Sequence, residues 1–293
     1  GWDANRVALE RAGLHLMAGR TEQARKLYLD LTKKPSPPVE AWFALARLAQ
    51  EQKDQPLLEE ALAVLKKDRA YAPGQFLLGD LALAGGAYDE ARRHFERVLV
   101  LDPAHVPALG RLAQMDFDRR DAVGLRRRTA ALLAVEPEHY LGNYFAATVH
   151  LAAGRNDLAE TALRKSLSAR EYDLALNDLA WILHERGEND EALKMSLRAV
   201  ELGPNNANNW DTLASIHESK ARNEEARVAL ERALTLASGK DPAILLHSVR
   251  LYTKLGLDKE AKSALEQLRG MGDRLPPRFI EELSAAERRL DRK

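Results

Sequence analysis

Two His-Glu pairs are the residues of this chain whose types best suit metal chemistry. His184 stands before Glu185, and His217 stands before Glu218. A zinc-binding helix needs a second histidine four positions after the first, so that both imidazoles lie on one face. Neither pair is followed by one. The sequence therefore predicts no metal site and no cofactor, and we interpret the two histidines as ordinary residues that line a surface.

A basic cluster is the feature closest to a phosphate-binding site. Its members lie within ten residues: Arg119, Arg120, Arg126, Arg127 and Arg128. Aspartates are interleaved with these arginines, and no aromatic residues alternate with them as in proteins that bind single-stranded nucleic acid. The formal net charge of zero also argues against a nucleic-acid or membrane-surface binder. We expect a solvated helix face and no nucleic-acid partner.

Several other chemistries are excluded by what the sequence lacks. There is no cysteine, so disulfides, thiolate metal sites and cysteine nucleophiles are impossible. The Gly85-Gly86 pair is interpreted as a helix turn, not as a phosphate loop. No apolar run reaches the roughly 18 residues that span a bilayer. We therefore predict a non-enzymatic, soluble segment, cytoplasmic or periplasmic, and the missing initiator Met before Gly1 predicts a piece of a longer protein.

An internal repeat supplies the elements that must position all of these side chains. Alanines recur 33 to 35 residues apart, or about twice that, at Ala24, Ala91, Ala159, Ala192, Ala226 and Ala261. Apolar residues near each of them recur at helical spacing, as in Leu176, Leu179 and Leu183, which predicts amphipathic helices. Glycines fall at the expected turn within a helix pair, and prolines follow the second helix. Such a period indicates one helical unit copied many times.

The best copy runs from residue 72 to 105 and carries Leu78, Gly79, Gly86, Ala91, Phe95 and Pro103. This pattern resembles the tetratricopeptide repeat, in which each copy is a pair of antiparallel helices. The resemblance implies an all-α fold, a right-handed α-solenoid of about eight tetratricopeptide helix pairs plus a C-terminal capping helix. Neighbouring copies would bury one another, because a lone pair cannot bury its apolar face.

The whole chain, residues 1–293, is predicted to form a single solenoid. Its copies are expected near residues 5–38, 39–71, 72–105, 106–139, 140–172, 173–206, 207–241 and 242–275. Residues 278–293 have an apolar stripe and a charged opposite face, which suits a cap on the last copy. Copies two and four are the weakest, because Leu58 and Leu125 stand where other copies have a small residue.

The resemblance also implies where a partner binds, since partners of this family usually lie along the inner groove that the first helices line. Projecting the inward positions of the first helices gives a predicted binding surface of Phe76, Asp80, Phe117, Tyr144, Thr148, Asn177, Trp181, His184, Asn208, Asp211, Ser215 and Arg250. Amide groups could bond a peptide backbone, and aromatic rings supply contact area. Trp181 and Tyr144 either line this groove or pack between neighbouring copies.

These features favour a non-catalytic scaffold for protein-protein interaction, which binds a peptide or protein partner in its concave groove as part of a multiprotein assembly. The alternative is the interaction module of a larger bacterial enzyme, or of an envelope or exopolysaccharide assembly machine, whose active domain lies outside this chain. Self-association is a third hypothesis, because unsealed solenoid ends can stack head to tail.

Overall fold

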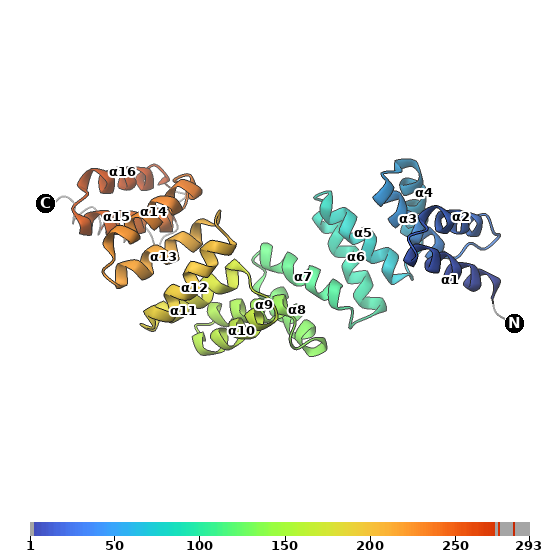
Figure 1. Ribbon diagram of the computed structural model, residues 1–293, viewed down its shortest axis with the longest axis horizontal. Coiled ribbons are helices and arrows are strands. Elements are labelled where there is room, and N and C mark those ends of the chain that lie inside the picture. Colours follow the sequence, from blue (N-terminus) through green and yellow to red (C-terminus); the bar gives the residue numbers. More distant parts are fainter. Residues whose placement is uncertain (1–2, 273–274, 276–283, 285–293) are drawn as a thin grey trace. The chain divides into compact units, whose positions relative to one another are not determined.

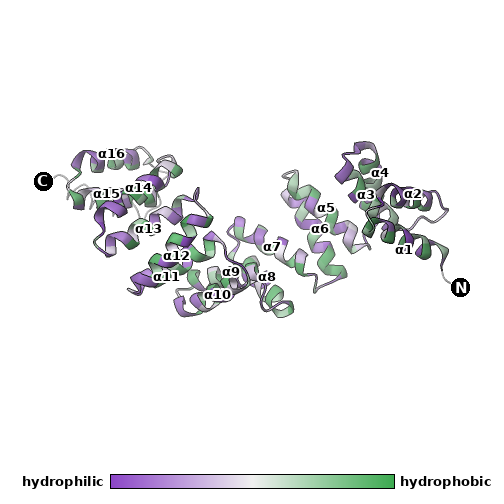
Figure 2. Ribbon diagram, viewed as in Figure 1, coloured by the Kyte–Doolittle hydropathy of each residue, from purple (hydrophilic) through white to green (hydrophobic). Residues whose placement is uncertain are grey.

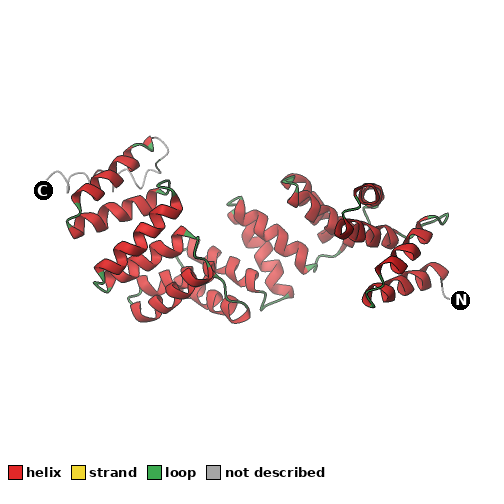
Figure 3. Cartoon of the chain, turned by 45° about the horizontal axis from the view of Figure 1, so that its top comes forward, coloured by secondary structure: helices red, strands yellow, loops and turns green. Residues whose placement is uncertain are grey.

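The computed structural model describes residues 3–272, 275 and 284, and this part of the chain contains sixteen α-helices and no β-strand. Consecutive helices pair as antiparallel hairpins (Figures 1 and 3). The predicted all-α fold of repeated helix pairs is thus confirmed. The predicted capping helix, residues 278–293, lies outside the described residues.

The chain divides into two compact units, residues 1–137 and residues 138–293. Unit 1 contains α1 (Ala4–Met17), α2 (Thr21–Thr32), α3 (Val39–Gln52), α4 (Gln55–Lys67), α5 (Ala72–Ala84), α6 (Tyr88–Leu101), α7 (Val106–Asp118) and α8 (Ala122–Val135). Unit 2 contains α9 (Tyr140–Ala152), α10 (Asn156–Ala169), α11 (Asp173–Glu185), α12 (Asn189–Leu202), α13 (Ala207–Ser219), α14 (Asn223–Ala237), α15 (Pro242–Leu255) and α16 (Asp258–Arg269). A single uninterrupted solenoid over residues 1–293 stays a prediction.

Small residues set how closely the two helices of a pair approach. The recurring alanines of the second helices are all fully buried: Ala24, Ala91, Ala159, Ala192, Ala226 and Ala261. In α4 the fully buried alanine is instead Ala61, and Leu58 is half-buried. The helix is rotated by about one residue there, so a small side chain still faces the core. Leu125 of α8 is buried beside Gly124.

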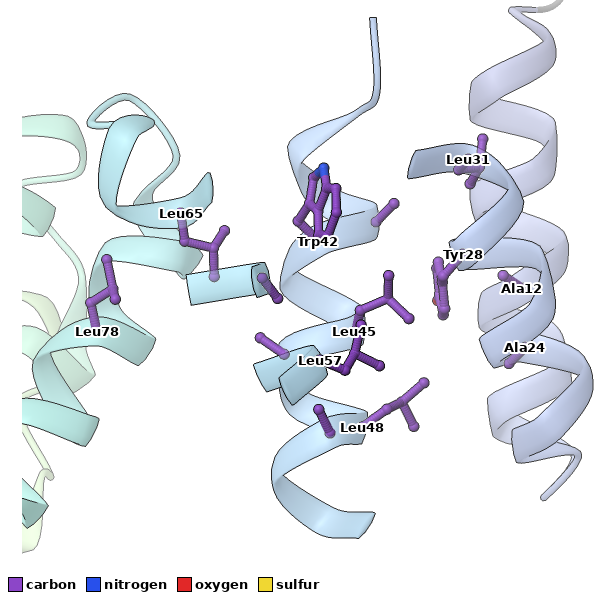
Figure 4. Close-up of a cluster of buried hydrophobic side chains, with 14 residues drawn as sticks. Ala12, Ala24, Tyr28, Leu31, Trp42, Leu45, Leu48, Leu57, Leu65 and Leu78 are labelled. Atoms are coloured by element: carbon purple, nitrogen blue, oxygen red, sulfur yellow. The ribbon is translucent and has the colours of Figure 1, made fainter. Parts of the chain in front are cut away.

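The core of each unit runs from one helix pair into the next. In unit 1, one cluster of buried side chains extends from Ala12 of α1 to Leu78 of α5. Figure 4 shows Tyr28 of α2 lying between its own helix pair and Leu45 of α3. Along each helix, hydrophobic and hydrophilic segments alternate (Figure 2), as expected where one face packs and the other meets water. Each pair therefore depends on its neighbours for burial.

A left-handed residue ends the first helix of every pair. Five of these positions are glycines with φ between +67° and +85°: Gly19, Gly86, Gly154, Gly187 and Gly256. Lys53, Arg120 and Ala221 occupy the same turn in the other pairs with φ of +55° to +59°. A side chain makes this conformation costly, by about 1 kcal/mol or more. The repeat geometry imposes it even where the sequence does not favour it.

Ala221→Gly is therefore expected to stabilise the protein by about 0.5–1 kcal/mol, the strain relieved less the extra entropy of glycine in the unfolded chain. Urea unfolding followed by circular dichroism measures the change. The matched control is Gly187→Ala, which creates the same strain one copy earlier and should destabilise by about 1 kcal/mol. Equal stability of both variants and the parent chain would contradict a strained turn at residue 221.

Candidate partner-binding surface

Within each unit, the first helices of successive pairs contact one another through side chains. In unit 1, Arg111 of α7 donates to Asp80 of α5 at 2.9 Å. In unit 2, the amide of Asn209 in α13 donates to Asp173 at the start of α11 at 3.2 Å, and His247 of α15 lies 2.6 Å from Asp211 of α13. We call this row of first helices the first-helix wall: α1, α3, α5 and α7 in unit 1, and α9, α11, α13 and α15 in unit 2.

Trp181 is the most exposed aromatic side chain predicted for this surface, with 44% of the residue accessible. It lies on α11 between Asn177 and His184, and the Trp181 and His184 rings are 5.7 Å apart. Leu174, on the same face, is 41% exposed. These residues are spaced by three or four positions, so they form one stripe along the helix. Of the two alternatives for Trp181, exposure on the first-helix wall is the one observed.

Tyr144 is buried, with 6% of the residue exposed, and so packs between neighbouring copies. Its ring lies edge-on to Tyr172 at 5.5 Å, and Tyr172 comes from the linker before α11. Burial raises the pKa of the neighbouring Asp178 carboxyl to about 6, although hydrogen bonds from Asn177 and Tyr144 act to lower that pKa. Sequence projection placed Tyr144 on the wall, but the next copy covers its ring. Tyr144 thus packs against the copy that carries Trp181, and its own ring is not available to a partner.

An ion cluster around the buried His247 links α13 to α15. The imidazole of His247 is 2.6 Å from Asp211 and 3.4 Å from Glu218, and Lys254 is 2.8 Å from Glu218. Burial alone would lower the pKa of His247, but hydrogen bonds to the two carboxylates outweigh it and raise the pKa to about 9. The hydrogen bond from His247 lowers the pKa of Glu218 to about 2, although burial opposes it. Asp211, predicted to meet a partner, is thus engaged within the wall.

The other predicted residues of unit 2 differ in their exposure and in their hydrogen bonds. Asn208 and Arg250 are exposed. The hydroxyls of Thr148 and Ser215 donate to carbonyls of their own helices, at 3.2 Å and 3.1 Å. His184 Nδ1 lies 2.8 Å from Asn189.

In unit 1, the predicted residues Phe76 and Phe117 are half-buried, and Asp80 is paired with Arg111. Two hollows open on the first-helix wall of this unit, of about 630 Å³ and about 350 Å³. Phe43 and Arg47 of α3 line both. The surface predicted from the sequence begins at Phe76 on α5 and does not include these two residues of α3. The same inward positions, read on α3, would have found them.

The arginines and histidines considered above as possible chemical sites have other roles in the structure. Arg119, which follows α7, pairs with Asp89 of α6 at 2.7 Å, and Arg128 of α8 pairs with Glu96 of α6 at 3.1 Å, so two members of the basic cluster are engaged within unit 1. His217 of α13 is buried. Within the described residues, no group of three or more histidine or acidic side chains could hold a metal ion. None of the helices described there is long and apolar enough to cross a bilayer.

The repeated helix pairs and their buried small residues define a helical repeat protein. Comparison with protein families makes this specific: models described as Tetratricopeptide repeat match residues 9–75 and 144–207, residues 72–105, and residues 207–239. The chain belongs to the tetratricopeptide-repeat family. Proteins of this family mediate protein-protein interactions and are generally non-catalytic scaffolds.

Two curated relatives are 28% identical to this chain. They are the TPR repeat-containing protein PA4667 of Pseudomonas aeruginosa, over 206 residues and 66% of this chain, and the Protein CTR9 homolog of Arabidopsis thaliana, over 198 residues and 63% of this chain. The matched regions span 33% and 17% of the relatives' own lengths, respectively.

Solved structures share the fold at low identity. A chain in the crystal structure of the APC/C hetero-tetramer Cut9-Hcn1 matches 97% of this chain and 56% of its own length, with a TM-score of 0.65 and 17% identity. Pseudomonas aeruginosa PilF matches 73% of this chain and 96% of its own length, with a TM-score of 0.59 and 16% identity. At these identities the likeness shows the fold alone.

Proposed function

We propose that this protein is a non-catalytic scaffold that binds a peptide or protein partner on its first-helix wall, as part of a multiprotein assembly. The observation that carries the proposal is the exposed ring of Trp181. Elsewhere on α11 the apolar residues Leu176, Leu179 and Ile182 are at most 3% exposed. A partly exposed indole is the kind of side chain that dominates binding energy when a partner covers it.

The surroundings of Trp181 suit an extended polypeptide. Leu174 lies two turns before it on the same face and adds a second exposed apolar contact. Asn208, exposed at the start of the neighbouring first helix α13, offers both a donor and an acceptor to a peptide backbone. A partner segment lying across α11 and α13 could therefore anchor a side chain against the indole and bond its main chain to amides.

The interaction-module alternative has one observation in its favour. The matched region spans only 33% and 17% of the curated relatives, so in those proteins the repeats belong to longer chains. In this alternative, the partner-binding wall would serve a larger enzyme or an envelope or exopolysaccharide assembly machine. The full-length reading frame distinguishes it from a freestanding scaffold.

The test uses peptides selected from a random-peptide display library on the full chain, with dissociation constants measured by fluorescence anisotropy. Trp181→Ala combined with Asn177→Ala is expected to weaken binding by at least tenfold, because truncating a central aromatic contact typically costs about 2 kcal/mol or more. Helix content and melting should change little, since Trp181 is already half exposed. Leu197→Ala, at a 50% exposed apolar residue of the second helix α12, is the matched control. Undiminished binding by the double variant would contradict the assignment to α11.

A further inference from the structure

The two hollows of unit 1 lie next to each other and share part of their lining. The larger is lined by α1, α2, α3 and Tyr71, and the smaller by α3, α5, His105 and the start of α7. Phe43 and Arg47 border both. We call this surface the unit 1 trough, represented by Glu40, Phe43, Arg47, Glu51, Tyr71 and Phe76. Volumes of about 630 Å³ and 350 Å³ are in the range of pockets that bury a ligand.

The floor of the unit 1 trough is aromatic and held in place. Phe43 lies edge-on to Tyr71 with ring centres 5.7 Å apart, and Phe76 contacts His105 at 5.2 Å. Phe76 also packs on the fully buried Phe95 at 5.4 Å. Rings fixed from below lose little conformational freedom on binding, so an apolar side chain of a partner meets a preorganised surface.

The rim of the unit 1 trough carries more negative than positive charge. Three carboxylates line the larger hollow, those of Glu10, Glu40 and Glu51, against the single guanidinium of Arg47. Glu10 is 3.4 Å from Arg6. Glu40, Arg47 and Glu51 are exposed, and none of them forms an ion pair with another described residue. The two glutamates lie on the same stripe of α3, about 16 Å apart along the helix axis.

We propose that the unit 1 trough binds an extended polypeptide segment that carries an aromatic or aliphatic anchor flanked by lysine or arginine side chains. The anchor lies on Phe43 and Phe76, and the flanking cations pair with Glu40 and Glu51. A spacing of about 16 Å is spanned by roughly five residues of extended chain, so cations on both sides of one anchor can reach both carboxylates. This inference rests on the proposed function in needing a polypeptide partner, but it uses different residues.

The experiment measures fluorescence anisotropy of three labelled peptides with the full chain. Each peptide is twelve residues long. The first has a central Leu-Phe pair with two Lys or Arg on each side, the second has Glu in place of those cations, and the third has Ala-Ala in place of the anchor. The first is expected to bind at least ten times more tightly than the other two, and more weakly as salt is raised, because the charge pairs are exposed.

The decisive variant reverses the charge of the trough's rim from negative to positive. Glu40→Lys combined with Glu51→Lys is expected to reverse the order of the basic and acidic peptides, a gain of binding that a damaged fold could not produce. Glu59→Lys combined with Glu60→Lys makes the same change in net charge at exposed residues of the second helix α4 and should preserve the original order.

An unchanged order of peptides in the Glu40/Glu51 variant would overturn the inference, and so would equal effects of the two charge-exchange variants. Either would leave the proposed function intact if display-selected peptides still bind through Trp181. Loss of the basic peptide in the Trp181/Asn177 variant, with binding retained in the Glu40/Glu51 variant, would place that peptide in unit 2 and also overturn the inference. Failure of every selected peptide to bind would instead refute the proposed function.

Discussion

Replacing His247 with leucine is expected to lower the free energy of unfolding by about 3 kcal/mol, because two partly buried carboxylates lose their shared cation. Asp211 then has no close positive partner in the cluster, and Glu218 keeps only Lys254. Urea unfolding gives the size of the loss. Hydrogen exchange should locate it in α13 and α15, since repeat stability is nearly a sum over neighbours.

The control for this substitution is His217→Leu. His217 is also buried, on α13, but its pKa is lowered by burial and it holds no ion pair within the described residues. A similar-sized apolar replacement there should cost less than about 1.5 kcal/mol. Equal losses in the two variants would show that side-chain volume, and not the ion cluster, accounts for the effect of His247→Leu.

The same cluster makes stability depend on pH. The pKa of His247 is raised from 6.5 to about 9, so its contribution is complete below about pH 6.5 and is lost as the pH rises through about 9. The pKa of Glu218 is lowered from 4.5 to about 2, so its contribution is complete above about pH 4.5 and is lost as the pH falls through about 2. The cluster should therefore stabilise the fold most between these limits.

Unfolding experiments from about pH 5 to pH 10 should show an alkaline loss of roughly 3 kcal/mol from this cluster, which is missing in His247→Leu. The difference between the two profiles isolates the histidine from other groups that titrate in this range. Parallel profiles would mean that His247 is not stabilised in its protonated form.

A second large effect is expected where α5 and α6 approach most closely. Phe95→Ala should cost about 3–5 kcal/mol, because Phe95 is fully buried and its removal leaves a cavity. Gly79 faces this ring: a β-carbon added there would lie 2.6 Å from Phe95 Cε1. Gly79→Ala should therefore destabilise the parent protein by about 1–2 kcal/mol, despite the better helix propensity of alanine.

The sign of the Gly79 effect should reverse once the ring is gone. In the Phe95→Ala background, Gly79→Ala should stabilise by about 1 kcal/mol, because helix propensity then acts alone. Gly110→Ala is the matched control in the parent chain, since nothing lies within 4 Å of its added β-carbon, and it should stabilise by a similar amount. A double-mutant cycle with additive effects would contradict direct contact between residues 79 and 95.

The helix pairs could be predicted from the sequence because each copy of the repeat needs a small residue where its two helices approach, and this requirement recurs along the chain. Each recurring alanine marks one close approach, and six of them prove fully buried. The rotation of α4 could not be predicted from a fixed column, since Leu58 and Ala61 both suit a buried helix face. Packing against α3 decides between them, and that requires three-dimensional information.

The candidate surface was predicted less completely, because a side chain at an inward position of its helix is not always exposed to solvent. Trp181 and Tyr144 both belong to the predicted inward stripe, but Trp181 is the ninth residue of α11 and Tyr144 the fifth of α9, and they are 44% and 6% exposed. Tyr172, a linker residue of the following copy, packs edge-on against the Tyr144 ring. Asp211 likewise faces inward, but His247, 36 residues later in the sequence, engages it. Contacts between copies therefore decide which wall residues remain available to a partner.

Site-specific photocrosslinking shows whether a polypeptide binds on the first helices or elsewhere on the protein. A photoreactive amino acid is placed singly at Leu174 or Asn208, on the first-helix wall, and at Leu197 or Val228, exposed on second helices, with Trp181 kept in every chain. Each chain is irradiated with a display-selected peptide. We predict crosslinks from residues 174 and 208 only. Crosslinks confined to residues 197 and 228 would contradict binding on the first-helix wall.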